Sequence, residues 1–210
     1  MSTTTNILDP AFTLSTPRLT ISHLDPENPT HCTLMLDLMH GKKASERMYA
    51  AASMIPDVAT AKVLLAAGKQ RMSETGYGRF IVCLKPVDAQ VEVEPIGVIS
   101  LNLARHPNTP SPTVPDLGFN FLDKHHGRGY AMEATSALMR FYHEEKGCVA
   151  FAGLTDLGNV EARTLLGKLG FEDRGMRCVK GVIGSGEALE LSVWTIGVGE
   201  GEEALGEVGL

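Results

Sequence analysis

The segment that decides the fold is residues 116–134, which have the sequence Asp116-Leu-Gly-Phe-Asn-Phe-Leu-Asp-Lys-His-His-Gly-Arg-Gly-Tyr-Ala-Met-Glu-Ala134. An apolar run typical of a strand is followed by a turn that contains Gly127 and Gly129, and then by a helix. Because glycine has no Cβ, both positions allow backbone angles that other residues disfavour. The first N–H groups of a helix lack partners within the helix and lie at the positive end of its dipole. The segment therefore predicts a strand–turn–helix unit whose turn can bind an anion such as a diphosphate.

The turn resembles motif A of the GNAT N-acetyltransferases, whose pyrophosphate loop has the pattern Gln/Arg-x-x-Gly-x-Gly/Ala. Here the loop is Lys124-His-His-Gly-Arg-Gly129, with lysine in place of the usual glutamine or arginine. Residues 159–171 resemble motif B of the same family, which ends in Lys-Leu-Gly-Phe. The continuation Gly129-Tyr-Ala-Met-Glu-Ala134 is similar to the branch of ribosomal-protein N-terminal acetyltransferases. Two motifs in this order and at this separation are more specific than either one alone.

The resemblance implies an α/β GNAT fold, with a mixed, mostly antiparallel, twisted sheet of about seven strands and helices on both faces. We expect an N-terminal extension at residues 1–14, the acetyltransferase domain at residues 15–197, and an acidic tail at residues 198–210. Residues 199–210 contain four glutamates and no basic residue. We therefore expect this tail to be disordered.

Hydrophobic periodicity predicts the remaining elements. Strands are expected near residues 18–24, 79–84, 96–101, 149–154, 173–179 and 189–196, and helices near residues 29–52, 58–73, 130–146 and 160–169. Residues 105–115 contain four prolines, which exclude a helix or a central strand and indicate a stiff extended loop.

Composition narrows the possible classes of function. The 210 residues are 43% hydrophobic, which is enough to build a core. A net charge of −6 argues against a nucleic-acid partner, which requires a basic surface. Residues 1–16 have neither the basic cluster nor the apolar run of a signal peptide, and no stretch approaches the ~18 apolar residues of a membrane span. We expect a cytoplasmic monomer or homodimer that binds neither nucleic acid nor membrane.

The cysteines and histidines do not suggest a metal site. The four cysteines form no Cys-x-x-Cys pair, so most are expected to be reduced and buried; they are Cys32, Cys83, Cys148 and Cys178. His125 and His126 are adjacent, so their side chains point apart, and no cysteine or carboxylate partner with metal-ligand spacing is near in sequence. No metal is expected.

The resemblance implies that acetyl-CoA is the cosubstrate and that the acceptor is a primary amine, on a protein N-terminus or on a small molecule. Backbone N–H groups from His126 to Ala131 would bind the pyrophosphate, and Lys124 and Arg128 would add positive charge. The strand backbone at residues 119–122 would pair with the pantetheine arm. The predicted cofactor-binding residues are Phe119, Asn120, Phe121, Leu122, Lys124, His126, Gly127, Arg128, Gly129, Tyr130, Ala131, Asn159 and Lys168.

Direct transfer also requires a neutral amine and a proton for the departing thiolate. Asp116 matches an acidic residue of this branch and is a candidate base, or it is only an exposed residue at the start of the strand. The resemblance implies that Asn159 contacts the pantetheine arm or a water near the thioester, and asparagine is also a good helix N-cap. The candidate catalytic residues are Asp116 and Asn159.

No general acid is identified in the sequence. The tyrosine acid of many GNAT enzymes aligns with Leu166, and the serine of the branch aligns with Ala162. The alternative function is therefore a GNAT-fold module that binds acyl-CoA, as a sensor or scaffold, without turnover.

Overall fold

The computed structural model describes residues 6–41, 55–86, 93–106 and 108–210. Its strands are β1 (Thr13–Ser15), β2 (Leu19–His23), β3 (Gly78–Leu84), β4 (Glu94–Asn102), β5 (Asp116–Phe121), β6 (Phe151–Thr155), β7 (Glu172–Val179) and β8 (Leu189–Ile196). Its helices are α1 (Pro29–His40), α4 (Val58–Thr75), α5 (Tyr130–Lys146), α6 (Val160–Lys168) and α7 (Gly201–Glu207), with a 3-10 turn, η1 (Asp123–His125).

The strands follow the order β1-β2-β3-β4-β5-β6-β8-β7 in one sheet. β1–β2, β2–β3, β6–β8 and β7–β8 pair antiparallel, whereas β5 and β6 run parallel. The expected mixed, mostly antiparallel sheet is confirmed. The strand that periodicity did not predict is β1, because three residues are too few to show an alternating pattern. The helix expected at residues 29–52 ends at His40, and residues 42–54 lie outside the described residues.

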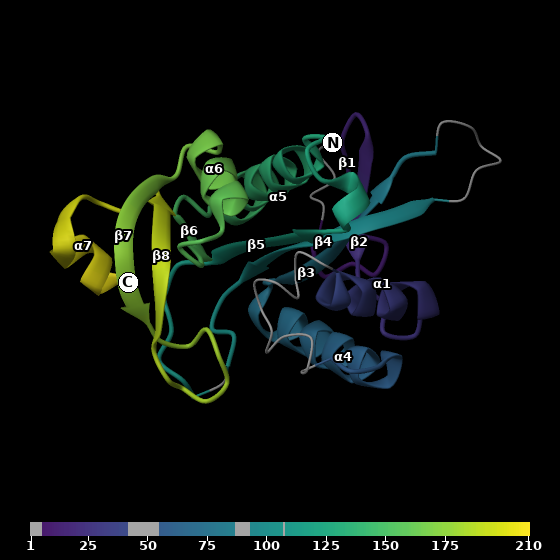
Figure 1. Cartoon of the computed structure of the whole chain (residues 1–210), viewed down its shortest axis with the longest axis horizontal. Coiled ribbons are helices and arrows are strands. Elements are labelled where there is room, and N and C mark those ends of the chain that lie inside the picture. The colour runs from purple at the N-terminus through teal and green to yellow at the C-terminus, as the bar shows by residue number, and fades with distance from the viewer. Residues whose placement is uncertain (1–5, 42–54, 87–92, 107) are drawn as a thin grey trace. The chain divides into compact units, whose positions relative to one another are not determined.

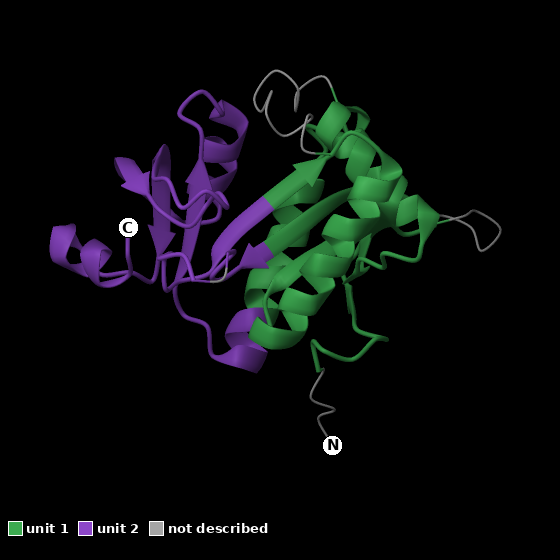
Figure 2. Ribbon diagram, turned by 90° about the horizontal axis from the view of Figure 1, so that it is seen from below, with its two compact units in different colours: residues 1–100, 119–141 green, residues 101–118, 142–210 purple. Residues whose placement is uncertain are grey.

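The chain forms two compact units, which are green and purple in Figure 2: residues 1–100 with 119–141, and residues 101–118 with 142–210. In the first unit, α1 and α4 lie on one face of the sheet and the start of α5 lies on the other (Figure 1). Leu34 of α1 and Leu65 of α4 share a core with Ile81 and Val98 of the sheet. Phe80, which neighbours Ile81 on β3, lies on the opposite face because successive strand residues alternate. Helices on both faces are thus confirmed.

The residues before β1 are also part of the first unit. Ile7 and Phe12 are 0% and 3% exposed. The ring of Phe12 packs 5.7 Å from that of Phe80 and 5.1 Å from that of Phe141 of α5, measured between centroids. The expected extension therefore contributes core side chains from Ile7 onward. The domain boundary at residues 14 and 15 stays a prediction.

The C-terminal residues differ from the disordered tail that their composition suggested. They form α7, in which Leu205 is 2% exposed. The Val208 carbonyl accepts a hydrogen bond of 3.0 Å from the Thr113 N–H group. Arg177 of β7 makes two hydrogen bonds to Glu202, of 2.7 and 2.6 Å. The structure differs from the expectation because Leu205 is buried and Arg177 binds Glu202, and neither contact can be recognised among the surrounding glutamates and glycines of the sequence.

The four cysteines are free thiols. Cys32 and Cys83 are buried, as expected, and burial raises the pKa of Cys83 to about 11. Cys148 is half-buried and Cys178 is exposed on β7, so the expectation of buried thiols holds for only part of the set. No described helix is both long and apolar enough to cross a membrane.

Candidate functional site

The candidate diphosphate turn, residues 124–131, has the backbone that its glycines predicted. Gly127 has φ 73° and Gly129 has φ 77°, both in the left-handed region that favours glycine. A Cβ at Gly127 would have no atom within 4 Å, so its surroundings are open. The requirement for glycine at Gly127 is therefore one of backbone conformation and not of packing.

The turn ends at a helix start whose N-cap residue has no side chain. The Gly129 carbonyl accepts the first helical hydrogen bond of α5, from the Glu133 N–H group at 3.1 Å. Gly129 thus occupies the N-cap position and has no side chain with which to satisfy the first amides. The N–H groups at Tyr130 and Ala131 belong to the first turn of α5, where helix geometry leaves amides without an internal partner. This geometry is suited to binding an anion.

Two of the predicted loop residues are already engaged. The Lys124 ammonium lies 2.6 Å from Glu94 Oε1, but both side chains are largely exposed, so the pair is worth roughly 0–1 kcal/mol and can open for a phosphate. The His126 ring donates to the Phe121 carbonyl at 2.8 Å, and its backbone N–H donates to the Asp123 carbonyl at 3.2 Å. We therefore expect anion contacts from the N–H groups that follow His126.

His125 packs under the turn. It is 6% exposed, and its ring lies 6.2 Å from that of Tyr130. Its Nε2 is 3.3 Å from Glu94 Oε1, and its buried Nδ1 has no hydrogen-bond partner among the described residues. Burial lowers the pKa of His125 below 6.5, which favours the neutral ring. His125 belongs to the predicted loop, but its burial was not predicted.

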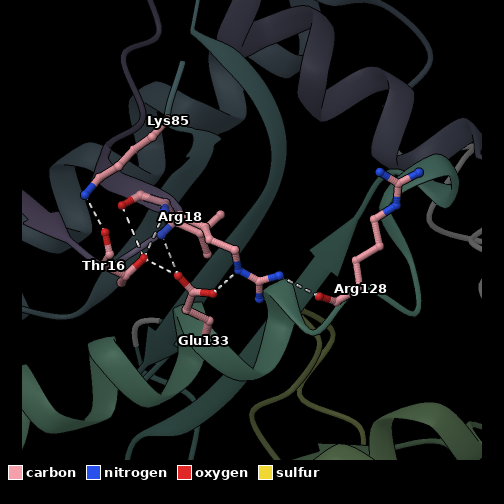
Figure 3. A network of polar contacts seen from close by, with 6 residues as sticks. Thr16, Arg18, Lys85, Arg128 and Glu133 are labelled. Atoms are coloured by element: carbon pink, nitrogen blue, oxygen red, sulfur yellow. Dashed lines mark hydrogen bonds and ion pairs between the residues drawn. The ribbon is translucent and has the colours of Figure 1, made fainter. Parts of the chain in front are cut away.

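Arg18 and Glu133 were not predicted as site residues, yet Arg18 contacts the turn and Glu133 binds Arg18 (Figure 3). Arg18 Nε donates to Glu133 Oε2 at 2.6 Å, and Arg18 Nη1 donates to the Arg128 carbonyl at 3.0 Å. The Arg18 guanidinium also lies over the Tyr130 ring, 4.6 Å from its centroid. We call this arrangement the Arg18–Glu133 clasp. Its sequence signal is weak, because the two residues lie 115 positions apart.

The end of β5 is fixed against its neighbours in the first unit. The Leu122 N–H donates to the Ile96 carbonyl at 3.0 Å, and the Asn120 side chain donates to the Leu38 carbonyl at 3.2 Å. A Cβ at Gly97 would lie 2.5 Å from the Phe121 ring, so this position of β4 must be glycine for β4 to lie this close to Phe121 of β5. These contacts hold residues 119–122 next to the turn.

Asp116 lies in the second unit, at the start of β5. It pairs with Ala152 in the single residue pair that joins β5 to β6. Asp116 is 6% exposed, and both carboxylate oxygens contact the Arg105 guanidinium, with Arg105 Nε 3.0 Å from Oδ2. The alternative of an exposed carboxylate is therefore wrong. The role of Asp116 as a base stays a prediction. To act as a base, the Asp116 carboxylate would have to separate from Arg105.

The motif B helix, α6, also lies in the second unit. Asn159 is its N-cap, and its Oδ1 accepts from the Ala162 N–H at 3.2 Å. Ala162 and Leu166, which align with the family's serine and tyrosine, are 5% and 2% exposed and belong to the core. Lys168 is exposed at the end of α6. The N-cap expectation is confirmed, whereas cofactor contact by Asn159 or Lys168 stays a prediction.

The structure thus brings residues 119–131 together in the first unit, whereas Asp116, Asn159 and Lys168 belong to the second. Among the described residues, no group of three or more histidine, cysteine, aspartate or glutamate side chains could hold a metal ion.

Solved structures with similar folds include many acetyltransferases. The acetyltransferase from Agrobacterium tumefaciens str. C58 matches with a TM-score of 0.63 and 21% identity, over 87% of this chain and 92% of that one. A putative ribosomal-protein-serine acetyltransferase from Vibrio cholerae matches with a TM-score of 0.65 and 16% identity, over 89% and 98%. The ribosomal L7/L12 alpha-N-protein acetyltransferase RimL, in complex with coenzyme A, matches with a TM-score of 0.64 and 12% identity, over 87% and 96%. At these identities the likeness shows the fold alone.

The sequence itself identifies the family. No curated protein matches the chain in a sequence search. The family model described as "Acetyltransferase (GNAT) domain" matches residues 18–172, which is more than half of the chain and includes both motifs. The chain belongs to the GNAT acetyltransferase family.

Proposed function

We propose that this protein is an acetyl-CoA-dependent N-acetyltransferase, which transfers the acetyl group directly to a primary amine. The observation that carries the proposal is the pair of left-handed glycines, Gly127 and Gly129, at the start of α5. Similar folds have been solved with coenzyme A, in RimL, and with acetyl-CoA and AMP, in the microcin C7 self-immunity acetyltransferase MccE. These likenesses support the donor more strongly than they support any particular acceptor.

In this proposal the backbone binds the donor. N–H groups from Gly127 to Ala131 bind the diphosphate, with added charge from Arg128 and from Lys124 once it leaves Glu94. Bound acetyl-CoA supplies the thioester. The backbone of residues 119–122 is next to the turn, where it can pair with the pantetheine arm.

The transfer step needs few side chains. The neutral amine attacks the thioester carbon, a C–N bond forms, the C–S bond breaks, and the thiolate receives a proton. Asp116 is the candidate base that relays the amine proton, after it separates from Arg105. Since Leu166 and Ala162 stand where the family has a tyrosine and a serine, and neither side chain can donate a proton, we propose that water protonates the thiolate. The acceptor is a protein N-terminus or a small amine.

The test is a pair of glycine substitutions with matched backbone strain. Gly127→Asp places a negative side chain where the diphosphate would bind. Gly147→Asp makes the same change at φ 64°, also in open space, at the other end of α5. We expect Gly127→Asp to weaken coenzyme A binding by about tenfold or more, about 1.4 kcal/mol, and Gly147→Asp to leave it unchanged. Calorimetry with coenzyme A measures both, and equal affinities in the two variants would contradict the proposal.

A second candidate function is a module that binds acyl-CoA without turnover. It is favoured by the ion pair of Asp116 with Arg105, and by leucine and alanine at positions 166 and 162, which cannot act as the acid. Thiol release from acetyl-CoA, followed across a panel of primary amines and peptides, separates the two candidates. Amine-dependent release supports the transferase, and tight coenzyme A binding without release supports the module.

A further inference from the structure

The backbone of Arg18 is held from two sides in the first unit. Its N–H donates to Glu133 Oε1 at 2.9 Å, and its carbonyl accepts from the Lys85 N–H at 2.9 Å. Thr16 fixes the turn that precedes β2. Its Oγ1 accepts a hydrogen bond of 2.9 Å from the Leu19 N–H. The backbone of Arg18 is therefore held in place independently of the turn, and this restricts the positions that its guanidinium can reach.

That guanidinium reaches both the turn and α5. It contacts the Glu133 carboxylate, the Arg128 carbonyl and the Tyr130 ring, and a Cβ at Gly129 would lie 3.5 Å from Arg18 Nη2. Figure 3 shows the side chain of Arg128 itself extending away from Arg18. Arg18 thus holds the carbonyl between the two left-handed glycines while leaving the Arg128 side chain free for a ligand.

Glu133 completes the arrangement from the first turns of α5. It accepts from Thr16 Oγ1 at 2.6 Å as well as from the backbone and side chain of Arg18. Burial by itself would raise the pKa of Glu133, but the hydrogen bonds from Thr16 and Arg18 outweigh it and lower the pKa below 4.5. The carboxylate is ionised at neutral pH and cancels most of the Arg18 charge. The contribution of the pair is therefore geometric, and it adds little net charge for a phosphate.

We infer that Arg18 and Glu133 are positioning residues that hold the diphosphate turn in its anion-binding conformation, an inference that rests on the proposed function for its effect on coenzyme A. A lysine cannot replace this arginine. It keeps the charge but lacks the planar fork that contacts the Glu133 carboxylate and the Arg128 carbonyl together, and it stacks less well on Tyr130.

The first test compares Arg18→Lys with Arg177→Lys, which makes the same change in the arginine–glutamate pair of Arg177 with Glu202. We expect Arg18→Lys to raise the coenzyme A dissociation constant about tenfold. The KM for acetyl-CoA should rise in parallel, while kcat and the acceptor KM stay near wild type. Arg177→Lys should change none of these values. Wild-type affinity in Arg18→Lys would overturn the inference and leave the proposed function standing.

The second test does not depend on the ligand. In ligand-free protein, Arg18→Lys and Glu133→Gln should each speed amide hydrogen exchange at residues 127–133, and Arg177→Lys should not. The double variant should exchange no faster than the faster single variant, because the two residues act as one unit. If the wild type itself fails to bind coenzyme A, the proposed function fails, and the exchange rates still decide whether the clasp orders the turn. Unchanged exchange in both single variants would overturn the inference.

Discussion

The diphosphate turn and the expected catalytic positions differ in how closely they follow the family pattern. In the turn, Gly127 and Gly129 adopt left-handed angles, and Gly129 occupies the N-cap position of α5. At the catalytic positions, Asp116 is buried against Arg105, and Leu166 is a core side chain. Donor binding depends on backbone shape, which can persist while side chains change. Proton transfer depends on particular side chains, and here Asp116 and Leu166 are both buried within the second unit.

The largest expected effect tests whether Asp116 is part of that packing. Arg105→Ala leaves a carboxylate that is 6% exposed without its partner, so the free energy of unfolding should fall by about 3 kcal/mol. Asp116→Asn should cost less, because the Arg105 side chain is 29% exposed and can reach water. Urea unfolding of the two variants measures the difference. If Arg105→Ala is as stable as the wild type, Asp116 is free in solution and the contrast between the two regions disappears.

Turnover of the Asp116→Asn variant then sharpens the comparison. A base that acts on the acceptor should affect turnover more than acetyl-CoA affinity, and most strongly below the pKa of the amine. Equal rates in the variant and the wild type, from about pH 6 to about pH 9, would show that Asp116 is structural.

The next effect concerns Leu166, the residue in place of the family's tyrosine. A Cβ at Gly153 would lie 2.5 Å from Leu166 Cδ2, so Gly153→Ala should destabilise the protein by about 2 kcal/mol through overpacking. Gly68→Ala is the matched control, because a Cβ there meets nothing within 4 Å and alanine favours a helix. Thermal unfolding of the variants measures both effects.

A double-variant cycle makes this test specific. Leu166→Ala empties the space that the methyl group of the Gly153→Ala variant would enter, so the double variant should lose less stability than the sum of the two single losses. Additive losses would mean that Leu166 does not fill this contact, and the position could then accommodate a tyrosine.

The sequence predicts the turn and the strand and helix on either side of it better than it predicts the contacts that support them. Glycine at a left-handed turn and asparagine at an N-cap act through their own backbone or the next turn, so Gly127, Gly129 and Asn159 could be interpreted locally. Arg18 and Glu133 meet only after β2 and α5 have packed, and nothing in either local pattern indicates the partner. The burial of Asp116 likewise depends on Arg105, across the proline-rich loop.

The smallest expected effect tests whether solvent is excluded from His125, beneath the turn. Burial lowers the pKa of His125 below 6.5; Glu94 opposes this shift, while Lys124 and Arg128 add to it. The unfolded chain therefore takes up a proton near pH 6.5 that the folded protein binds only at lower pH. The stability that His125 contributes is complete above about pH 6.5 and is lost as the pH falls through the folded-state pKa.

His125→Phe should remove this dependence without emptying the space, because it keeps a ring of similar size and leaves no unpaired Nδ1. Every other ionisable group is present in both proteins, so the difference between the two stability curves isolates His125. Below about pH 6.5, the unfolding free energy of the wild type should fall faster than that of the variant, by less than about 1.4 kcal/mol for each pH unit. Urea unfolding at a series of pH values measures it. Parallel stability curves for the wild type and the variant would mean that water reaches His125. The contacts of His125 with Glu94 and Tyr130 would then hold the turn less firmly than the structure indicates.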